Sequence, residues 1–293
     1  MIIIKSFAVG HGDMFYINHG SDNFTMIDCC LSDDNADEVL TELKALRAKK
    51  TIARFISSHP DDDHLRGLEY LEATVGIENF YCVKNAAKKD DETVSFSTYC
   101  ELRDDPKKAF YLFKGCSRRW MNQDGDGRGA AGINILWPDV SNVEFKAALA
   151  DAEMGLSPNN ISTVIKYSLN GGATALWMGD LESDFMESIE DVLELPPVDI
   201  LFAPHHGRDS GKIPASMLEK MSPKIIVVGE APSEHLHYYP EYNTITQNRA
   251  GHIVFGCDGQ KVHVFTSEEY EVDFLVNEYM TFGNMHYVGT LNL

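Results

Sequence analysis

The segment 56–68, ISSHPDDDHLRGL, gathers histidines and aspartates in the spacing H-x-D-x-D-H. The candidate ligands within it are His59, Asp61, Asp63 and His64. In an extended turn alternate side chains project to the same side, so these imidazole and carboxylate groups can point at one place. Imidazole with carboxylate is a ligand set for zinc or, as the share of oxygen rises, for manganese. The alternative is an acidic surface turn that carries incidental histidines.

Further candidate ligands follow apolar runs elsewhere in the chain. Asp180 comes directly after TALWMG, and His205 and His206 come after ILFAP. Functional side chains of α/β proteins lie at the carboxyl ends of strands, so three such ends that carry Asp or His predict one metal site. Adjacent side chains diverge, so we expect only one of the two histidines to bind, with His205 favoured. For Asp180 the alternative is an N-cap before LESDFMESI, a role that it could share with ligation.

Hydrophobic patterning predicts the elements that position these residues. The expected strands are 2–9, 13–18, 23–30, 53–58, 77–83, 133–139, 162–169, 174–180, 198–204, 223–229, 252–257 and 261–266. The expected helices are 33–50, 65–74, 143–154, 183–194 and 214–221. The NGG between 162–169 and 174–180 indicates a hairpin. Strands and helices alternate without a linker or a repeat, which predicts one α/β domain over 1–293 with a surface insert, irregular and partly helical, at about 84–130.

The charge balance bears on the partners that this chain can take. Its 293 residues carry 25 basic and 45 acidic side chains, a net charge of −20, which disfavours non-specific binding of a polyanion. The segment 84–130 differs, with ten basic and eight acidic residues. Any contact with a polyanion is therefore expected there, and Arg118 and Arg119 are its candidate phosphate-binding residues. A solvated face is the alternative.

Cysteine usage and the amino-terminal residues bear on the cellular location. The six cysteines lack CxxC spacing, so we expect reduced and mainly structural thiols. The apolar run at 1–9 is too short for a membrane span and lacks an extended signal-peptide core. We expect a cytoplasmic protein with no membrane partner.

Five motifs, in order, resemble the metallo-β-lactamase superfamily and, within it, the branch of the hydrolase-like domain of the competence protein ComEC. They are VGHGDMFYI, SHPDDDHLRGL, NNISTVIKYSL, MGDLE and APHHG. The resemblance covers roughly residues 2–265. It implies a four-layer αβ/βα sandwich with a metal site along one edge.

The resemblance also implies two unequal metal positions. One would use Asp63, His64, Asp180 and His205, and the other His59, Asp61 and the shared Asp180. Asp61 stands where the superfamily more usually has a second histidine, and a later histidine is absent, with Asn160 near its place. We therefore expect the second position to bind more weakly. The oxygen-rich set favours Mn²⁺ or a single tightly held Zn²⁺, one or two ions per chain.

The expected function is metal-dependent hydrolysis, with phosphodiesterase or nuclease activity on DNA or RNA, by a metal-activated hydroxide, as the first expectation. Asp63, Asp180 and His205 would be catalytic. Asp28, Asn160 and His206 would support the ligands, and His237 and Arg208 would contact substrate, as would Arg118 and Arg119. One alternative is a thioester, lactone or amide hydrolase of the same fold, which the charge of −20 favours. Another is an inactive metal-binding module that recognises a protein partner.

Overall fold

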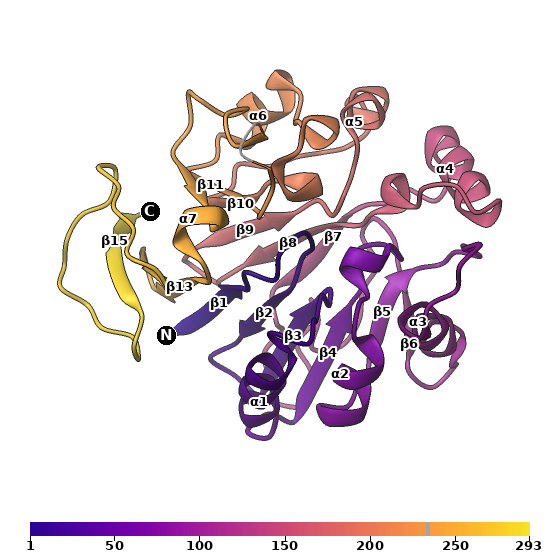
Figure 1. The fold of residues 1–293 in the computed structure, drawn as a ribbon, viewed down its shortest axis with the longest axis horizontal. Helices are drawn as coiled ribbons and strands as arrows, with labels where there is room; N and C mark the ends of the chain where they lie inside the picture. The colour runs from indigo at the N-terminus through magenta and orange to yellow at the C-terminus, as the bar shows by residue number, and fades with distance from the viewer. Residues whose placement is uncertain (233–234) are drawn as a thin grey trace.

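Two β-sheets pack face to face in the computed structural model, which describes residues 1–232 and 235–293 (Figure 1). In spatial order the nine-stranded sheet contains β15 (His286–Asn292), β14 (Lys261–Thr266), β13 (Ile253–Asp258), β1 (Ile2–Ser6), β2 (Phe15–Asn18), β3 (Asn23–Ile27), β4 (Ile52–Ile56), β5 (Phe80–Val83) and β6 (Ala109–Leu112). The six-stranded sheet contains β12 (Thr244–Thr246), β11 (Ile225–Val228), β10 (Ile200–Phe202), β9 (Thr174–Trp177), β8 (Val164–Ser168) and β7 (Ile133–Trp137).

Helices cover the outer face of each sheet (Figure 1). Those on the nine-stranded sheet are α1 (Ala36–Arg47), α2 (Leu68–Thr74) and α3 (Val94–Asp104). Those on the six-stranded sheet are α4 (Val143–Glu153), α5 (Ser183–Ile189) and α6 (Ala215–Met221), and the single turn α7 (Gln247–Ala250) follows β12. The α/β class and the four-layer αβ/βα sandwich expected from the sequence are confirmed. No helix among the described residues has the length and apolar character needed to cross a membrane.

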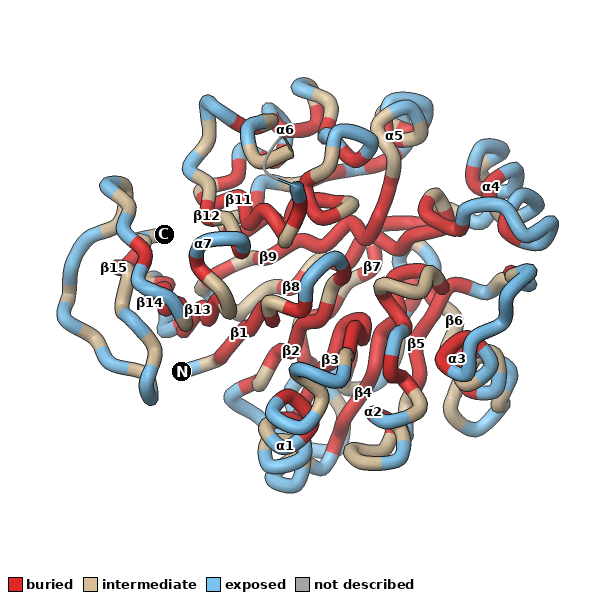
Figure 2. The backbone as a smooth tube through the Cα atoms, in the orientation of Figure 1, coloured by how far each residue is buried: buried red, intermediate tan, exposed pale blue. Residues whose placement is uncertain are grey.

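Strand alternation divides the apolar side chains between two cores. On β4, Phe55 packs outward beneath the helices and Ile56 packs inward, between the sheets. Aromatic rings fill the inner core: the centroid of Phe15 lies 4.9 Å from that of Phe202, and Trp177 stacks on Phe202 at 4.8 Å. Figure 2 shows most strands as the buried centre of the molecule and the helices with exposed outer sides, whereas the edge strand β15 is largely intermediate or exposed. The two sheets are therefore held together by burial of their inner faces.

Most expected elements occur where the patterning predicts them. β8 and β9 form the predicted antiparallel hairpin, with Ser168 opposite Thr174. α1 has Asp37 and Glu38 in its first turn and basic residues in its last, as the helix dipole favours. β12, α7 and β15 were not expected. They have three, four and seven residues, and the pairing of β15 with β14 shifts register next to Gly289.

The segment 84–130 is less peripheral than a surface insert. It contains α3, and β6 within it pairs in parallel with β5, so it extends the nine-stranded sheet. Met121 is fully buried between the sheets and Cys116 nearly so. The buried Arg54 of β4 donates to the carbonyl oxygen of Trp120 at 3.0 Å. In the sequence the apolar residues of this segment occur in short runs between basic residues, so they do not indicate a buried element. In the structure part of the segment belongs to the core.

Candidate metal centre

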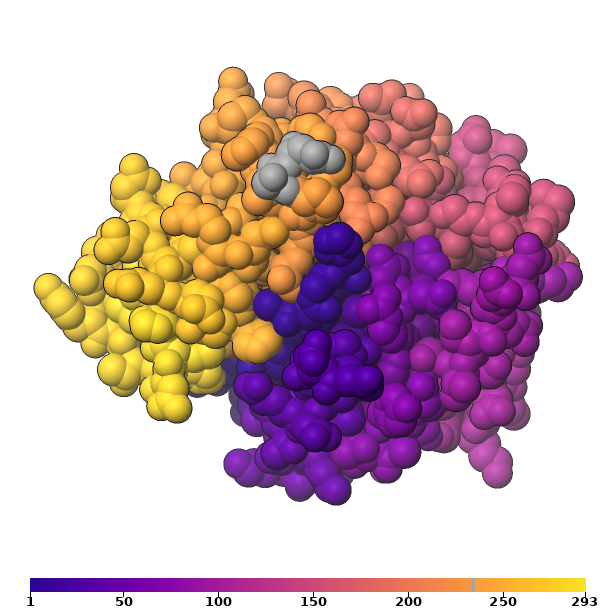
Figure 3. Space-filling model, in the orientation of Figure 1, coloured from indigo at the N-terminus to yellow at the C-terminus, as the bar shows by residue number. Residues whose placement is uncertain are grey.

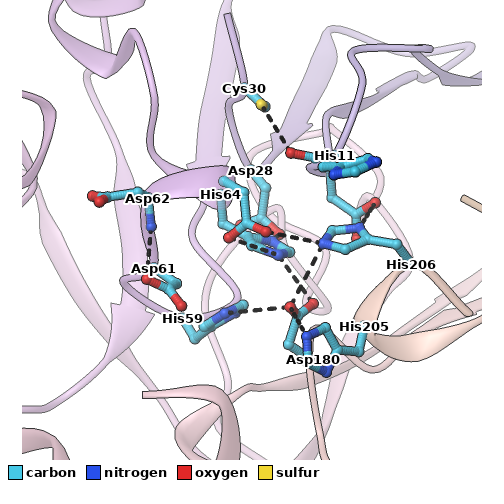
Figure 4. A network of polar contacts seen from close by, with 12 residues as sticks. His11, Asp28, Cys30, His59, Asp61, Asp62, His64, Asp180, His205 and His206 are labelled. Atoms are coloured by element: carbon cyan, nitrogen blue, oxygen red, sulfur yellow. Dashed lines mark hydrogen bonds and ion pairs between the residues drawn. The ribbon is translucent and has the colours of Figure 1, made fainter. Parts of the chain in front are cut away.

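The candidate ligands lie together at one edge of the sandwich, where the two sheets meet (Figure 4). Asp28 follows β3 and the segment 59–64 follows β4 in the nine-stranded sheet. Asp180 follows β9, and His205 and His206 follow β10, in the six-stranded sheet. These are the carboxyl ends of the strands, where the sequence places them. Each sheet thus supplies part of the cluster.

The tightest group of ligand atoms surrounds the carboxylate of Asp180. Its Oδ1 lies 3.0 Å from His64 Nε2, and its Oδ2 lies 3.6 Å from His206 Nε2. Asp63 approaches the same two rings, with Oδ2 at 3.2 Å from His206 Nε2 and Oδ1 at 3.9 Å from His64 Nε2. Ligand atoms of Asp13, His64, Asp180 and His206 all lie within 4.8 Å of one another. Asp13 contacts Nδ1 of His206, whereas Asp63 contacts Nε2, the nitrogen that faces Asp180. We therefore call Asp63, His64, Asp180 and His206 the first position.

Hydrogen bonds on the outer side of each ring fix which nitrogen faces this group. His64 Nδ1 lies 2.9 Å from Asp28 Oδ2, and His206 Nδ1 lies 3.2 Å from Asp13 Oδ1. An ionised carboxylate can only accept, so each Nδ1 carries the hydrogen and each neutral ring presents its Nε2 lone pair inward. A lone pair that faces carboxylate oxygens at 3.0 to 3.6 Å is repelled unless a proton or a metal ion lies between them. The residues of the first position therefore fit a divalent ion.

A second group of nitrogens approaches Asp180 through its Oδ2. Ser58 Oγ donates its single hydrogen to Asp28 Oδ2 at 2.6 Å, so it accepts from His59 Nδ1 at 3.0 Å. His59 Nε2 then faces Asp180 Oδ2 at 3.9 Å, and this buried nitrogen has no hydrogen-bond partner among the described residues. His205 Nε2 lies 3.8 Å from the same oxygen. We call His59, Asp61, His205 and the shared Asp180 the second position.

The loop after β10 has a strained backbone that brings both neighbouring histidines to Asp180. His205 (φ 51°) and His206 (φ 56°) are both left-handed, a conformation that costs a residue with a side chain about 1–3 kcal/mol. Gly207 follows at φ 83°, where an added Cβ would lie 2.6 Å from Val228. From the sequence we expect only one of the two histidines to bind, with His205 favoured and His206 in support of a ligand. Both rings reach Asp180, and His206 also reaches Asp63, so the geometry favours His206 for the first position.

Electrostatics at the first position favour a bound positive charge. Burial lowers the pKa of His206, but the carboxylates of Asp13 and Asp180, with the hydrogen bonds to Asp13 and Asp63, raise it to about 10. Burial also lowers the pKa of His64, yet Asp180 and Asp28 raise it well above its ordinary value. The pKa of Asp180 would rise on burial, but His64 and His206 hold it well below its usual range. Without an ion, protons on these rings balance the carboxylates.

Two other expected site residues have different partners. Asp61 Oδ1 accepts from Lys89 Nζ at 2.7 Å and from the backbone nitrogen of Asp62 at 2.9 Å. Asn160 uses both of its amide atoms on Glu182: Nδ2 donates to Oε2 at 2.9 Å, and Oδ1 accepts from the backbone nitrogen at 3.1 Å. Asn160 thus anchors the loop after β9, which carries Asp180.

The basic residues expected to bind substrate are not brought to the site. Arg118 Nη2 donates to Asn79, and its guanidinium packs over the rings of Tyr81 and Phe110. Asn79 directly precedes β5, so this contact lies at the amino end of the strand, opposite to the carboxyl ends that carry the candidate ligands. Arg119 pairs with Asp126 at 2.8 Å. Hydrogen bonds, rings and a local carboxylate already engage these two arginines, and their contact with phosphate stays a prediction.

The remaining two substrate-binding expectations concern Arg208 and His237. Arg208 follows the two histidines, and its backbone nitrogen donates to His205 O at 2.9 Å. His237 is exposed and lies shortly after 233–234, which are outside the described residues. Both stay predictions.

Sequence reasoning missed the group that holds His206. Asp13 lies in the loop between β1 and β2, and its backbone nitrogen donates to Asp63 O at 3.2 Å. Figure 3 shows this amino-terminal segment, in indigo, at the surface between the purple and orange parts of the chain. The available signal was the GHGD motif, whose aspartate follows two turn-forming glycines. Ser58, between Asp28 and His59, was missed as well.

A cavity of about 700 Å³ opens beside the cluster. Its lining includes Ser210, whose Oγ lies 2.9 Å from His205 Nδ1, and Glu182, the partner of Asn160. Asp184, Glu187 and Asp209 also line it, with Lys212 as the basic residue. The space next to the second position is therefore mainly acidic.

No protein-family model matches this chain, and no curated protein matches it. Solved structures with a similar fold include the metallo hydrolase Igni18 of Ignicoccus hospitalis, at 14% identity and a TM-score of 0.49, over 87% of this chain and 99% of that one. A metallo-β-lactamase of Cronobacter sakazakii is similar at 19% identity and a TM-score of 0.36, over 67% and 76% of the two chains. The diiron β-hydroxylase CmlA of Streptomyces venezuelae is similar at 12% and 0.40, over 78% and 44%. The ComEC-like branch stays a prediction.

Proposed function

We propose that this chain is a metal-dependent hydrolase that cleaves a phosphodiester. The observation that carries the proposal is the first position: two carboxylates and two imidazole Nε2 lone pairs converge at the edge of the sandwich, and each ring is held from behind by another carboxylate. A bound divalent ion supplies Lewis-acid chemistry and lowers the pKa of a water that it binds. Two oxygens and two nitrogens suit Zn²⁺ or Mn²⁺.

The protein's own groups have separate tasks in this proposal. Asp63 and Asp180 supply negative charge, and Asp28 and Asp13 orient the two rings. The left-handed turn at His206 holds its ring against Asp63, so the ligand atoms are positioned before any ion arrives. Ligands set in this way lose little conformational freedom on binding.

A nucleic-acid substrate has less support than a small phosphodiester. Arg118 and Arg119 have other partners, and the net charge of −20 opposes a polyanion. The acidic cavity beside the second position favours a second candidate, a hydrolase of an uncharged or cationic ester, thioester, lactone or amide. The choice between the two belongs to experiment.

The test is hydrolysis of bis(p-nitrophenyl) phosphate by metal-stripped protein that has been refilled with Mn²⁺ or Zn²⁺. Asp180→Ala is expected to abolish turnover, and Asp191→Ala, an exposed aspartate after α5, to leave it unchanged. Parallel assays use p-nitrophenyl acetate and a thioester. Turnover of these esters alone would move the function to the second candidate. Metal uptake with no turnover of any substrate would contradict the hydrolase and support a partner-binding module.

A further inference from the structure

We infer that Lys89 takes the place of a second ion: its ammonium group holds Asp61 and Asp62, so that this chain binds one divalent ion rather than two. The inference takes one point from the proposed function, namely that the first position binds a divalent ion. Lys89 is a positioning residue that sets metal stoichiometry.

The ammonium group lies on the carboxylates that flank the second position. Lys89 Nζ lies 2.7 Å from Asp61 Oδ1 and 3.0 Å from Asp62 Oδ1. The Lys89 side chain is 16% exposed, whereas those of Asp61 and Asp62 are 36% and 47% exposed. The lysine is therefore the more shielded partner, and one cation serves two carboxylates.

The segment around Lys89 is held in place by contacts outside the site. The backbone nitrogen of the preceding Lys88 donates to Ala152 O, in the last turn of α4, at 3.0 Å. The ammonium of Lys89 also lies 5.6 Å from the ring centroid of Phe96 in α3, within the range of a cation–π contact. Two helices thus direct Lys89 toward Asp61, which is more than a chance surface pairing provides.

The two positions differ in the state of their carboxylates. At the first position Asp63 and Asp180 face imidazole lone pairs, and no lysine or arginine pairs with either within the described chain. At the second, Asp61 Oδ1 already accepts two hydrogen bonds, from Lys89 and from the backbone of Asp62. Among the described residues, Asp61 forms an ion pair with Lys89 but not with His59 or His205.

An ion entering the second position would therefore meet a positive charge and a carboxylate whose Oδ1 already accepts two hydrogen bonds. It would have to break the Lys89 to Asp61 hydrogen bond, to bind Asp61 through its other oxygen beside the ammonium group, or to bind with His59, His205 and Asp180 alone. Each route weakens the second ion relative to the first, because the ammonium group of Lys89 repels a second cation. The sequence predicts a weaker second position from the change of a histidine to Asp61, and Lys89 is a separate cause.

The experiment counts ions per chain by elemental mass spectrometry. Metal-stripped protein is dialysed against Mn²⁺ or Zn²⁺ and then against metal-free buffer. Wild type is compared with Lys89→Ala, with Lys89→Gln, which keeps most of the stem, and with Lys89→Arg, which keeps the charge. Lys88→Ala, at an exposed neighbouring lysine, is the matched control. Electron paramagnetic resonance of the Mn²⁺ forms distinguishes an isolated ion from an exchange-coupled pair.

One ion is expected in wild type, Lys88→Ala and Lys89→Arg, and two ions, with a coupled spectrum, in Lys89→Ala and Lys89→Gln. Two ions in wild type, or one ion in both variants that lack the charge, would overturn the inference. One ion without hydrolytic turnover would contradict the proposed function and leave the inference standing. A chain that retains no ion would overturn both.

Discussion

Replacing Asp28 by Asn tests whether one buried carboxylate sets the orientation of two candidate ligands. Asp28 accepts from the backbone nitrogen of Ser58 at 2.7 Å, from Ser58 Oγ at 2.6 Å and from His64 Nδ1 at 2.9 Å. Asp28 has a left-handed backbone (φ 55°), a conformation that Asn tolerates as well as Asp does. The substitution therefore changes one oxygen to an amide nitrogen and leaves the backbone as it is.

The expected loss follows from where that nitrogen falls. The backbone nitrogen of Ser58 keeps the amide oxygen at the position of Oδ1, so the NH₂ group faces His64 Nδ1. His64 must then carry its hydrogen on Nε2, the atom that faces Asp180. The hydrogen bonds from His64 Nδ1 and Ser58 Oγ both lose their charged acceptor. A hydrogen bond to a charged group contributes about 1.5–3 kcal/mol, and 1.4 kcal/mol is about tenfold in affinity. Metal affinity is expected to fall about 10- to 100-fold, the usual effect of removing an outer partner of a ligand histidine.

The assay is competition for Zn²⁺ with a chromophoric chelator at neutral pH. Asp33→Asn, in the exposed loop before α1, removes the same charge and serves as the control. Equal affinities for Asp28→Asn and Asp33→Asn would refute the reasoning, because they would show that His64 does not depend on Asp28 for its tautomer.

Three further predictions concern protons, the paired histidines and the inner core. The pKa of His206 is raised from 6.5 to about 10, so its protonated form stabilises the metal-free protein fully below about pH 6.5, and this contribution disappears as the pH rises through 10. Metal binding between pH 6.5 and pH 10 should therefore release a proton from this ring. Calorimetry in buffers of different ionisation heat should detect that release. His206→Ala is expected to remove the ion of the first position and His205→Ala to leave it bound, so equal metal contents would contradict the assignment of His206. Trp177→Ala should lower the free energy of unfolding by about 3–5 kcal/mol in denaturant titration, against about 0.5 kcal/mol or less for Tyr279→Ala at a side chain that is 86% exposed.

The sequence predicts the architecture because the relevant signals are local. Apolar runs between turn residues locate the strands, and the spacing of apolar residues locates α1 and α2. The carboxyl ends of parallel strands lie at one edge of a sheet, which is why Asp28 lies near the segment 59–64 in one sheet and Asp180 near the histidine pair in the other. The packing of the two sheets then brings the two edges together. Their role as ligands stays a prediction.

What the sequence does not predict depends on contacts distant along the chain. Asp13 reaches His206 across 193 residues, and no local pattern connects a glycine turn to a histidine pair in the other sheet. The left-handed turn at His205 also has no decisive local signal, since histidine adopts that conformation more often than most residues with a side chain but still only in a small fraction of cases. The packing of Arg118 on Tyr81 and Phe110 is likewise visible only in three dimensions, whereas its charge alone favours a phosphate contact.

The contacts of His206 have a consequence for the order in which the protein folds. They join it to Asp13 and to Asp63, which are 193 and 143 residues away, so the site closes some of the longest loops in the chain. Contacts of such separation form late, because chain entropy must be lost before they return any energy. A bound ion would stabilise only the chain in which both sheets have already docked, by an amount set by its free concentration relative to its dissociation constant. Chelation would then first loosen the edge where the sheets meet, and resistance to protease there would report the supply of metal.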